Sequence, residues 1–220
     1  MKMNDLFNNL QKLNTLSKIP AKSSAVVIPL LEISGEFHIL FEQRSKNLGF
    51  QPGEVCFPGG RIEANETPKA AAIRELCEEL LLAPAKVTNN SNVNDSFTCN
   101  CDTLPRLEIL TDLTPLMGPT GALVFPYVGL LKNYEMTFSP SEVEKVFTYP
   151  ISFFKNNPAV RYNMQKKTIP PENFPYEKVT GGKNTYPWHT QHYDMWIYEK
   201  AEPVIWGFTG RLLHSFIELI

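Results

Sequence analysis

The pattern of apolar positions changes along the N-terminal part of the chain from helical to strand-like spacing. Residues 3–18 carry an apolar side chain at every third or fourth position, which predicts an amphipathic helical extension over residues 1–22. The apolar runs 25–31 and 37–41 are separated by Ser-Gly-Glu, a sequence typical of a tight turn. A β-hairpin is therefore expected after the extension.

A helix with a clear start follows this hairpin. Residues 44–60 contain four glycines and two prolines and are expected to form a loop. Thr67 is a suitable N-cap and Pro68 suits the first helical position. The helix is expected to run to residues 80–82, just before Pro84.

The second half of the chain mixes strands and helices without a repeated strand–helix–strand unit. Residues 88–103 are polar and rich in asparagine, which predicts an exposed insertion, and residues 156–190 are expected to form a long surface excursion. A short turn is expected at 141–146 and a closing helix at 206–220. Strands are expected at residues 107–110, 122–131, 147–151 and 195–198. The fold class is therefore predicted to be α+β, or a three-layer α/β/α sandwich, with no linker that divides the chain.

Composition and charge narrow the possible partners. The chain has 220 residues, is 43% hydrophobic and 20% charged, and has a formal net charge of −2, which fits a soluble globular protein without a global preference for nucleic acid or membranes. Of the four cysteines, Cys99 and Cys101 form a C-x-C with no second pair at metal-ligand spacing, so a structural zinc site is not expected. Neither a signal-peptide core, a membrane span nor a C-terminal peroxisomal address is recognised, so a cytoplasmic location is expected.

Three carboxylates on the predicted helix are the strongest chemical signal. Glu75, Glu78 and Glu79 are spaced i, i+3 and i+4, so they share one helix face, where like charges repel. A hard divalent cation such as Mg²⁺ or Mn²⁺ neutralises such a group through oxygen ligands. Taken alone, an ordinary solvated acidic face is the more common interpretation.

The residues around these carboxylates match a longer motif. The Nudix box, G-x5-E-x7-R-E-U-x-E-E-x-G-U with U aliphatic, fits with one departure, and six of the matching positions require a single residue type. Six such matches arise by chance in roughly one of tens of millions of windows. The matching residues are Gly60, Glu66, Arg74, Glu75, Leu76, Glu78, Glu79 and Leu82. The chain therefore resembles the Nudix hydrolases, which implies one Nudix domain over residues 23–220, with a mixed sheet and a loop–helix–loop metal site.

The resemblance also implies roles for individual residues. Glu75, Glu78 and Glu79, with the backbone carbonyl of Gly60, are expected to bind Mg²⁺ or Mn²⁺. Glu66 is expected to brace the loop, and Arg74 is expected to orient the carboxylates. The expected catalytic base is Glu79 first and Glu142 second, and for Glu142 an ordinary exposed loop residue is an equal alternative.

One box position departs from the family pattern. Leu81 stands where the family has a glycine that ends the helix with positive φ. Because a branched side chain disfavours that conformation, the helix is expected to continue or to end differently near Pro84.

The segment before the box resembles the signature of coenzyme A diphosphatases, L-L-x-x-R-S-x3-R-x3-G-x3-F-P-G-G. By this resemblance, Arg44, Ser45 and Phe57 are expected to contact the substrate. Gly49 replaces the second arginine of the signature, and Lys46 is the nearby cation that could substitute. Residues 141–151 and 205–210 resemble further segments of the same subfamily.

The predicted activity is hydrolysis of CoA or acyl-CoA to a 4′-phosphopantetheine product and adenosine 3′,5′-bisphosphate. Two alternatives remain: a diphosphatase for another nucleoside diphosphate derivative such as ADP-ribose, and a catalytically silent nucleotide-binding module. The presence of Glu75, Glu78 and Glu79 argues against a catalytically silent module. The expected partner is a small nucleotide, without nucleic acid or membrane, and the family and the N-terminal helix favour a homodimer.

Overall fold

The computed structural model describes residues 23–82, 105–118 and 121–220. The predicted helix in 1–22 and the predicted insertion 88–103 lie outside the described residues. Contacts group the chain into two compact units, one ending at Thr148 and one formed by Tyr149–Ile220.

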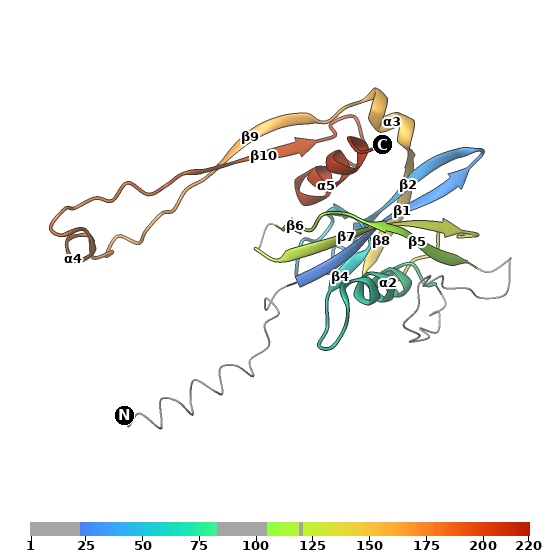
Figure 1. The fold of residues 1–220 in the computed structure, drawn as a ribbon, viewed down its shortest axis with the longest axis horizontal. Coiled ribbons are helices and arrows are strands. Elements are labelled where there is room, and N and C mark those ends of the chain that lie inside the picture. The colour runs from blue at the N-terminus through green and yellow to red at the C-terminus, as the bar shows by residue number, and fades with distance from the viewer. Residues whose placement is uncertain (1–22, 83–104, 119–120) are drawn as a thin grey trace, which may run out of the picture. The chain divides into compact units, whose positions relative to one another are not determined.

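The first unit is built around a mixed sheet in which β1 (Ser23–Ile33) is central. β1 pairs in parallel with β7 (Leu123–Lys132) and antiparallel with β2 (Glu36–Arg44), as Figure 1 shows. The remaining strands are β3 (Val55–Cys56) and β8 (Val143–Pro150), which pair with β2, β4 (Gly59–Arg61), which pairs with β1, and β5 (Arg106–Asp112) and β6 (Leu116–Met117), which pair with β7. The α+β class and the mixed sheet predicted from the sequence are confirmed.

The turn between β1 and β2 follows the chemistry of its two residues. Ser34 and Gly35 both have positive φ, 52° and 82°, as a two-residue type I′ hairpin requires. Pro29, which has no amide hydrogen, lies between the part of β1 paired with β4 and the part paired with β2. The predicted hairpin is confirmed, and Pro29 lies where the antiparallel partner of β1 changes from β4 to β2.

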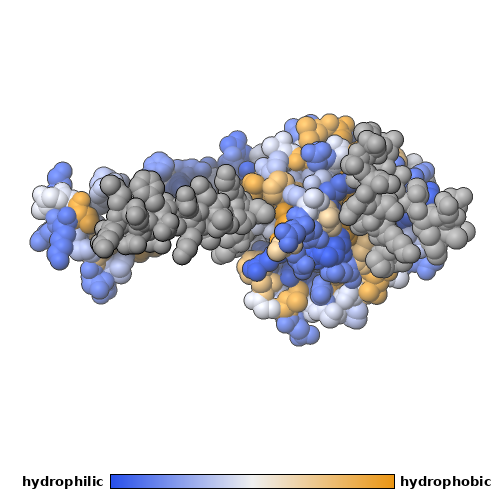
Figure 2. Space-filling view, turned by 60° about the horizontal axis from the view of Figure 1, so that its bottom comes forward, coloured by the Kyte–Doolittle hydropathy of each residue, from blue (hydrophilic) through white to orange (hydrophobic). Residues whose placement is uncertain are grey.

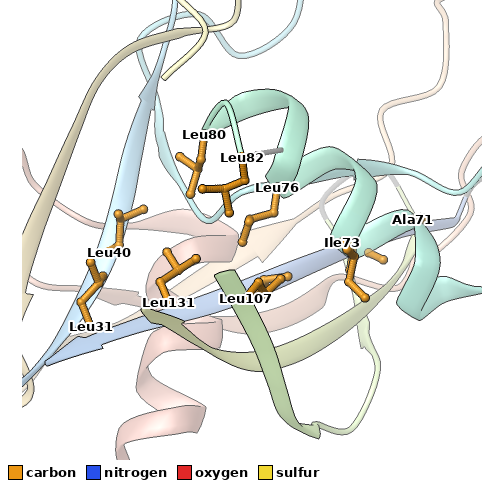
Figure 3. Packing of buried hydrophobic residues seen from close by; sticks show 12 residues of the cluster. Leu31, Leu40, Ala71, Ile73, Leu76, Leu80, Leu82, Leu107 and Leu131 are labelled. Carbon is orange, nitrogen blue, oxygen red and sulfur yellow. The ribbon is translucent and has the colours of Figure 1, made fainter. Parts of the chain in front are cut away.

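One helix, α2 (Pro68–Glu79), covers a face of this sheet. The Thr67 hydroxyl accepts a hydrogen bond from the Ala70 amide at 3.2 Å, which confirms the predicted N-cap. The apolar side of α2 packs on strands β1, β2, β5 and β7 (Figure 3), and each fully buried leucine contributes about 1.5–3 kcal/mol. Its residues are Ala71, Ala72, Ile73, Leu76 and Leu80. This packing leaves the carboxylate side of the helix free to face β4.

The helix ends in a way that the sequence did not predict. Leu81 adopts positive φ, 54°, and the Leu82 amide donates to the Cys77 carbonyl at 3.0 Å, which is the Schellman arrangement usually built on glycine. Leu80 and Leu82 on either side are buried, whereas Leu81 is 57% exposed. The burial of the two flanking leucines outweighs the roughly 1–2 kcal/mol cost of a left-handed leucine. The expectation that Leu81 would change the helix exit is wrong.

Several loop predictions also require correction. The segment 44–60 contains the short strands β3 and β4, which the glycines and prolines concealed. The expected turn at 141–146 ends earlier, since β8 begins at Val143. The expected excursion 156–190 contains β9 (Val160–Lys166) and the short helix α4 (Tyr176–Thr180). β9 was missed because the prolines, asparagines and aromatic residues across 156–190 obscured the short alternation of Val160, Tyr162 and Met164 with polar residues.

The second unit contains a long hairpin and two further helices. β9 pairs antiparallel with β10 (Gln191–Ile197), α3 (Ile151–Asn156) precedes the hairpin, and α5 (Gly207–Ile217) packs against β10 (Figure 1). The strand and closing helix predicted here are confirmed. On the surface seen in Figure 2, hydrophilic and apolar residues are interspersed. No helix in the described part of the chain is both long and apolar enough to cross a membrane.

We predict that Leu81→Gly stabilises the protein. Glycine adopts the left-handed conformation without the leucine's steric cost, and this gain exceeds the about 0.5–1 kcal/mol of added chain entropy, so a net gain of up to about 1 kcal/mol is expected. Thermal unfolding measures the difference. Leu81→Ala, which keeps a Cβ at the same exposed position, is the control and should show no such gain; a lower melting temperature for Leu81→Gly would contradict the prediction.

Candidate active site

Two adjacent glycines bring the backbone of β4 against α2. A Cβ at Gly59 would lie 2.3 Å from the Ala25 carbonyl oxygen, and Gly59 has a φ of 151°, so only glycine fits beside β1. A Cβ at Gly60 would lie 2.3 Å from the Glu75 carboxyl carbon. The absence of a side chain at Gly60 therefore lets the Glu75 carboxylate lie directly against the β4 backbone.

Arg74, on α2, holds the preceding loop in place through hydrogen bonds. Its Nε and Nη2 donate to both oxygens of the Glu66 carboxylate at 2.9 and 3.0 Å, a bidentate pair. Nη2 also donates to the Arg61 carbonyl at 3.0 Å, and the Glu63 amide donates to Glu66 Oε2 at 3.0 Å. The Arg74 hydrogen bonds lower the pKa of Glu66, and those of Glu66 raise the pKa of Arg74, so this pair stays ionised. The structure thus brings Glu66 and Arg74 into contact and fixes the loop before α2.

The same guanidinium reaches the carboxylate face of α2. Arg74 Nη1 donates to Glu75 Oε1 at 2.9 Å and to Glu78 Oε2 at 3.3 Å. The Glu78 side chain is 57% exposed, whereas Glu75 is largely covered. Burial raises the pKa of Glu75, opposed by the Arg74 hydrogen bond and reinforced by the negative charges of Glu78 and Glu142.

Glu79 lies on the inner side of the helix. Only 3% of it is exposed, and its Oε2 accepts a hydrogen bond from the Gly59 amide at 2.8 Å. Burial raises the pKa of Glu79 well above its usual range, and the negative charge of Glu42 adds to that effect, while the Gly59 hydrogen bond opposes it. A buried carboxylate beside other carboxylates is an environment typical of catalytic or metal-binding groups.

The donor set of the predicted metal site fits a hard divalent cation. Glu75, Glu78 and Glu79 offer carboxylate oxygens, and the pKa values of Glu75 and Glu79 are raised by burial first and by neighbouring negative charges second. A cation there would offset this charge, and oxygen ligands are those that Mg²⁺ and Mn²⁺ prefer. Among the described residues, no three acidic, histidine or cysteine side chains already surround a common point, since Arg74 and the Gly59 amide hold these carboxylates in separate contacts.

Glu42, on β2, belongs to this cluster and was missed in the sequence. It is 1% exposed; Cys56 Sγ donates to its Oε1 at 3.2 Å, and its Oε2 has no hydrogen-bond partner among the described residues. Burial raises the pKa of Glu42 to about 7, opposed by the Cys56 hydrogen bond and the charge of Arg44. A glutamate two residues after the inward-facing Leu40 of an apolar strand was the available signal.

Arg44, Ser45 and Glu142, which the sequence placed in different predicted roles, lie close together. The Ser45 amide donates to the Glu142 carbonyl at 2.8 Å, and Ser45 is 5% exposed. The Arg44 Nε donates to the Phe50 carbonyl at 3.4 Å, and its charge lowers the pKa of both Glu42 and Glu79. Arg44 is therefore a cation at the margin of the carboxylate cluster.

Two other sequence candidates lie differently from expectation. Phe57 was expected to contact substrate, yet it is 4% exposed and stacks on Phe41 at 5.1 Å between ring centroids, so its side chain serves packing. Lys46, considered as a replacement for the arginine absent at Gly49, forms a 3.0 Å ion pair with Glu144 on the surface. Of the signature residues, Arg44 is thus a cation near the carboxylate cluster, whereas Phe57 is part of the packed core.

We predict that Glu42→Gln changes the pH dependence of stability. With a folded-state pKa of about 7 against 4.5, Glu42 keeps a proton in the folded chain that the unfolded chain loses. The free energy of unfolding of the wild type therefore falls as pH rises from about 4.5 to 7, by up to about 3 kcal/mol. Glutamine does not titrate, so the free energy of unfolding of the variant should rise relative to that of the wild type between pH 5 and pH 8.

Urea unfolding of both proteins at several pH values, in the presence of a chelator, measures this difference. Glu63→Gln, at an exposed position outside the buried cluster, is the matched control. A difference between Glu42→Gln and wild type that stays constant with pH would show that Glu42 is not a buried carboxyl with a raised pKa.

Comparison with known proteins agrees with this geometry. The model of the NUDIX domain matches residues 21–151, more than half of the chain. A peroxisomal coenzyme A diphosphatase of Mus musculus is 33% identical over 151 residues, 68% of this chain and 55% of that protein. A peroxisomal coenzyme A diphosphatase of Caenorhabditis elegans is 32% identical over 156 residues, 67% and 58% of the two chains. Nudix hydrolase 3 of the same organism is 27% identical over 230 residues, 96% and 83%.

The alignments with the two coenzyme A diphosphatases span little more than half of their lengths. Those relatives are named peroxisomal, so the cytoplasmic location expected for this chain stays a prediction. The matched residues 21–151 include β4, the Arg74 contacts and the whole carboxylate face of α2. The chain therefore belongs to the NUDIX family.

Proposed function

We propose that this chain is a metal-dependent hydrolase that cuts the diphosphate bond of CoA or a short acyl-CoA. The products are 4′-phosphopantetheine, or its acyl form, and adenosine 3′,5′-bisphosphate. The observation that carries the hydrolase proposal is the packing of the Glu75 and Glu79 carboxylates against the bare backbone of Gly59 and Gly60. This arrangement gathers negative oxygen ligands of the kind that bind a hard divalent cation beside the β4 backbone.

The residues proposed to hold Mg²⁺ or Mn²⁺ are Glu75, Glu78 and Glu79, with the carbonyl of Gly60. The cation, when bound, offsets the charge of the diphosphate oxygens and eases the ionisation of water. Arg74 positions Glu75 and Glu78 through its Nη1, while its bond to Glu66 keeps the guanidinium in place. Glu78, which is the most exposed of the three, can turn toward a ligand with the least rearrangement.

Glu79 is the proposed general base. One of its oxygens is fixed by the Gly59 amide, which orients the carboxylate, and the second oxygen takes the proton from the attacking water. Glu142 is the alternative base: its backbone is held by the Ser45 amide, and its negative charge acts on both Glu42 and Glu75. Both candidates thus lie within electrostatic reach of the same cluster.

CoA is the proposed substrate because of Arg44 and the similarity to the two named coenzyme A diphosphatases. Arg44 is a cation beside the carboxylate cluster, and CoA carries a 3′-phosphate in addition to its diphosphate. One observation favours a second candidate. The signature's second arginine is replaced by Gly49, and Lys46 is already paired with Glu144, so a substrate without the 3′-phosphate, such as ADP-ribose, is the competing choice.

We predict that Glu79→Gln and Glu78→Gln each nearly abolish turnover and leave the fold intact. Removing one of several neighbouring negative charges relieves repulsion, so the melting temperature should hold or rise. Glu63→Gln, in the loop outside the box, is the control and should be mild. Steady-state kinetics at saturating Mg²⁺ and Mn²⁺ measures the effect, and full activity in either variant would refute the metal-site assignment.

We predict that Arg44→Ala discriminates between CoA and dephospho-CoA. Loss of a charge-assisted contact to the 3′-phosphate should lower kcat/KM for CoA by roughly tenfold or more. Arg44 also acts on Glu42 and Glu79, and any effect through these residues should lower kcat/KM for both substrates alike. The ratio of the two kcat/KM values therefore isolates the contact to the 3′-phosphate. An equal loss on both would place Arg44 at the diphosphate or in the scaffold.

The substrate class is tested on the wild-type protein. CoA, acetyl-CoA, ADP-ribose, NADH and diadenosine polyphosphates are each offered with Mg²⁺ and with Mn²⁺, and the products are separated. The proposal expects CoA or acetyl-CoA to have the highest kcat/KM. Cleavage of ADP-ribose without cleavage of CoA would overturn the CoA proposal and leave diphosphate hydrolysis standing.

A further inference from the structure

The β9–β10 hairpin has one apolar face. Its register pairs Val160 with Ile197, Tyr162 with Met195 and Met164 with Tyr193. Because side chains alternate along each strand and directly paired residues share a face, these six side chains lie on the same side of the ribbon. The hairpin is therefore amphipathic, although none of β9 is buried.

The opposite face is polar and is the one that α5 covers. Arg161 Nη2 and Asp194 Oδ2 are 2.7 Å apart, and Trp196 stacks on His214 of α5 at 3.7 Å between ring centroids. A Cβ at Gly210 of α5 would lie 2.3 Å from the Trp196 carbonyl oxygen, so the helix approaches β10 closely. Since the covering helix meets Trp196, the face that carries Tyr162 and Met195 is turned away from it.

The apolar face remains in contact with solvent. Val160 is 41% exposed, Tyr162 42%, Met164 37% and Tyr193 48%. A contiguous exposed apolar patch on an ordered element marks an interaction surface. The apolar face of the ribbon is therefore the candidate interaction surface.

We propose that the partner is a second copy of this chain, packed ribbon on ribbon as a homodimer. Across the two central pairs, Tyr162 lies opposite Met195 and Met164 lies opposite Tyr193, so tyrosine and methionine alternate in both directions. A two-fold axis in the plane between two such faces, running along or across the ribbon, sets each tyrosine on a methionine of the partner. Sulfur–aromatic contacts are favourable, so the face is complementary to itself.

The available area fits a reversible dimer. A fully covered aromatic side chain buries about 150–250 Å², so the partly exposed residues of this face provide roughly 300–400 Å² per copy. This is less than the about 800 Å² per partner of a standard interface, so the dimer is expected to be weak and reversible.

A charge placed on either face of the ribbon tests the proposal. Met164→Glu puts a carboxylate into the apolar face, and Gln165→Glu puts the same charge on the polar face one residue further along the strand. Sedimentation velocity of the full chain from 1 to 100 µM measures the oligomeric state. We expect a dimer for the wild type, at least about thirtyfold weaker association for Met164→Glu, and a change of less than about threefold for Gln165→Glu.

Tyr193→Ser, a milder change on the same face, replaces Met164→Glu if thermal unfolding shows that the latter does not fold; it should weaken the dimer too. A monomeric wild type at 100 µM would overturn the proposal and point to a cover within the chain, such as residues 1–22. A dimer that survives both face variants but is lost on deletion of residues 1–22 would also overturn it. The inference does not depend on the proposed catalysis, because none of these residues belongs to the carboxylate cluster.

Discussion

The concentration of negative charge between α2, β2 and β4 is the constraint on which the rest of the first unit depends. Glu75, Glu78 and Glu79 repel one another, and Glu42 is buried beside them. Arg74 is the principal counter-charge, with hydrogen bonds to Glu75 and Glu78 and a bidentate bond to Glu66. These hydrogen bonds offset part of the negative charge of the cluster, and the remainder is the charge that the proposed cation would neutralise.

The sheet and the apolar side of α2 make this arrangement possible. Leu76 and Leu80 fix the helix on strands β1, β2, β5 and β7, which turns the acidic side toward β4. The helix can come close because Gly59 and Gly60 have no side chains to separate it from the strand. The hydrophobic core thus sets the position of the helix, and the two glycines set the distance between its carboxylates and the backbone.

The parts of the structure that depend on local pattern were predictable from the sequence. The Thr67 cap, the Ser34-Gly35 turn and the box residues each follow from chemistry within a few positions. The burial of Glu42 was not predictable in the same way, since it depends on Cys56 and Glu79, which come from distant segments. Leu81 shows the converse case: tertiary burial of its neighbours overrides a local preference that the sequence states clearly.

The division into two units falls inside a strand. β8 runs from Val143 to Pro150 and is paired with β2, while the boundary lies between Thr148 and Tyr149. The peptide that joins the units is therefore part of an ordered strand, and ordered backbone opens to proteases less often than loops do. The two units should consequently stay joined under limited digestion at this point, and any early cleavage should occur elsewhere along the chain.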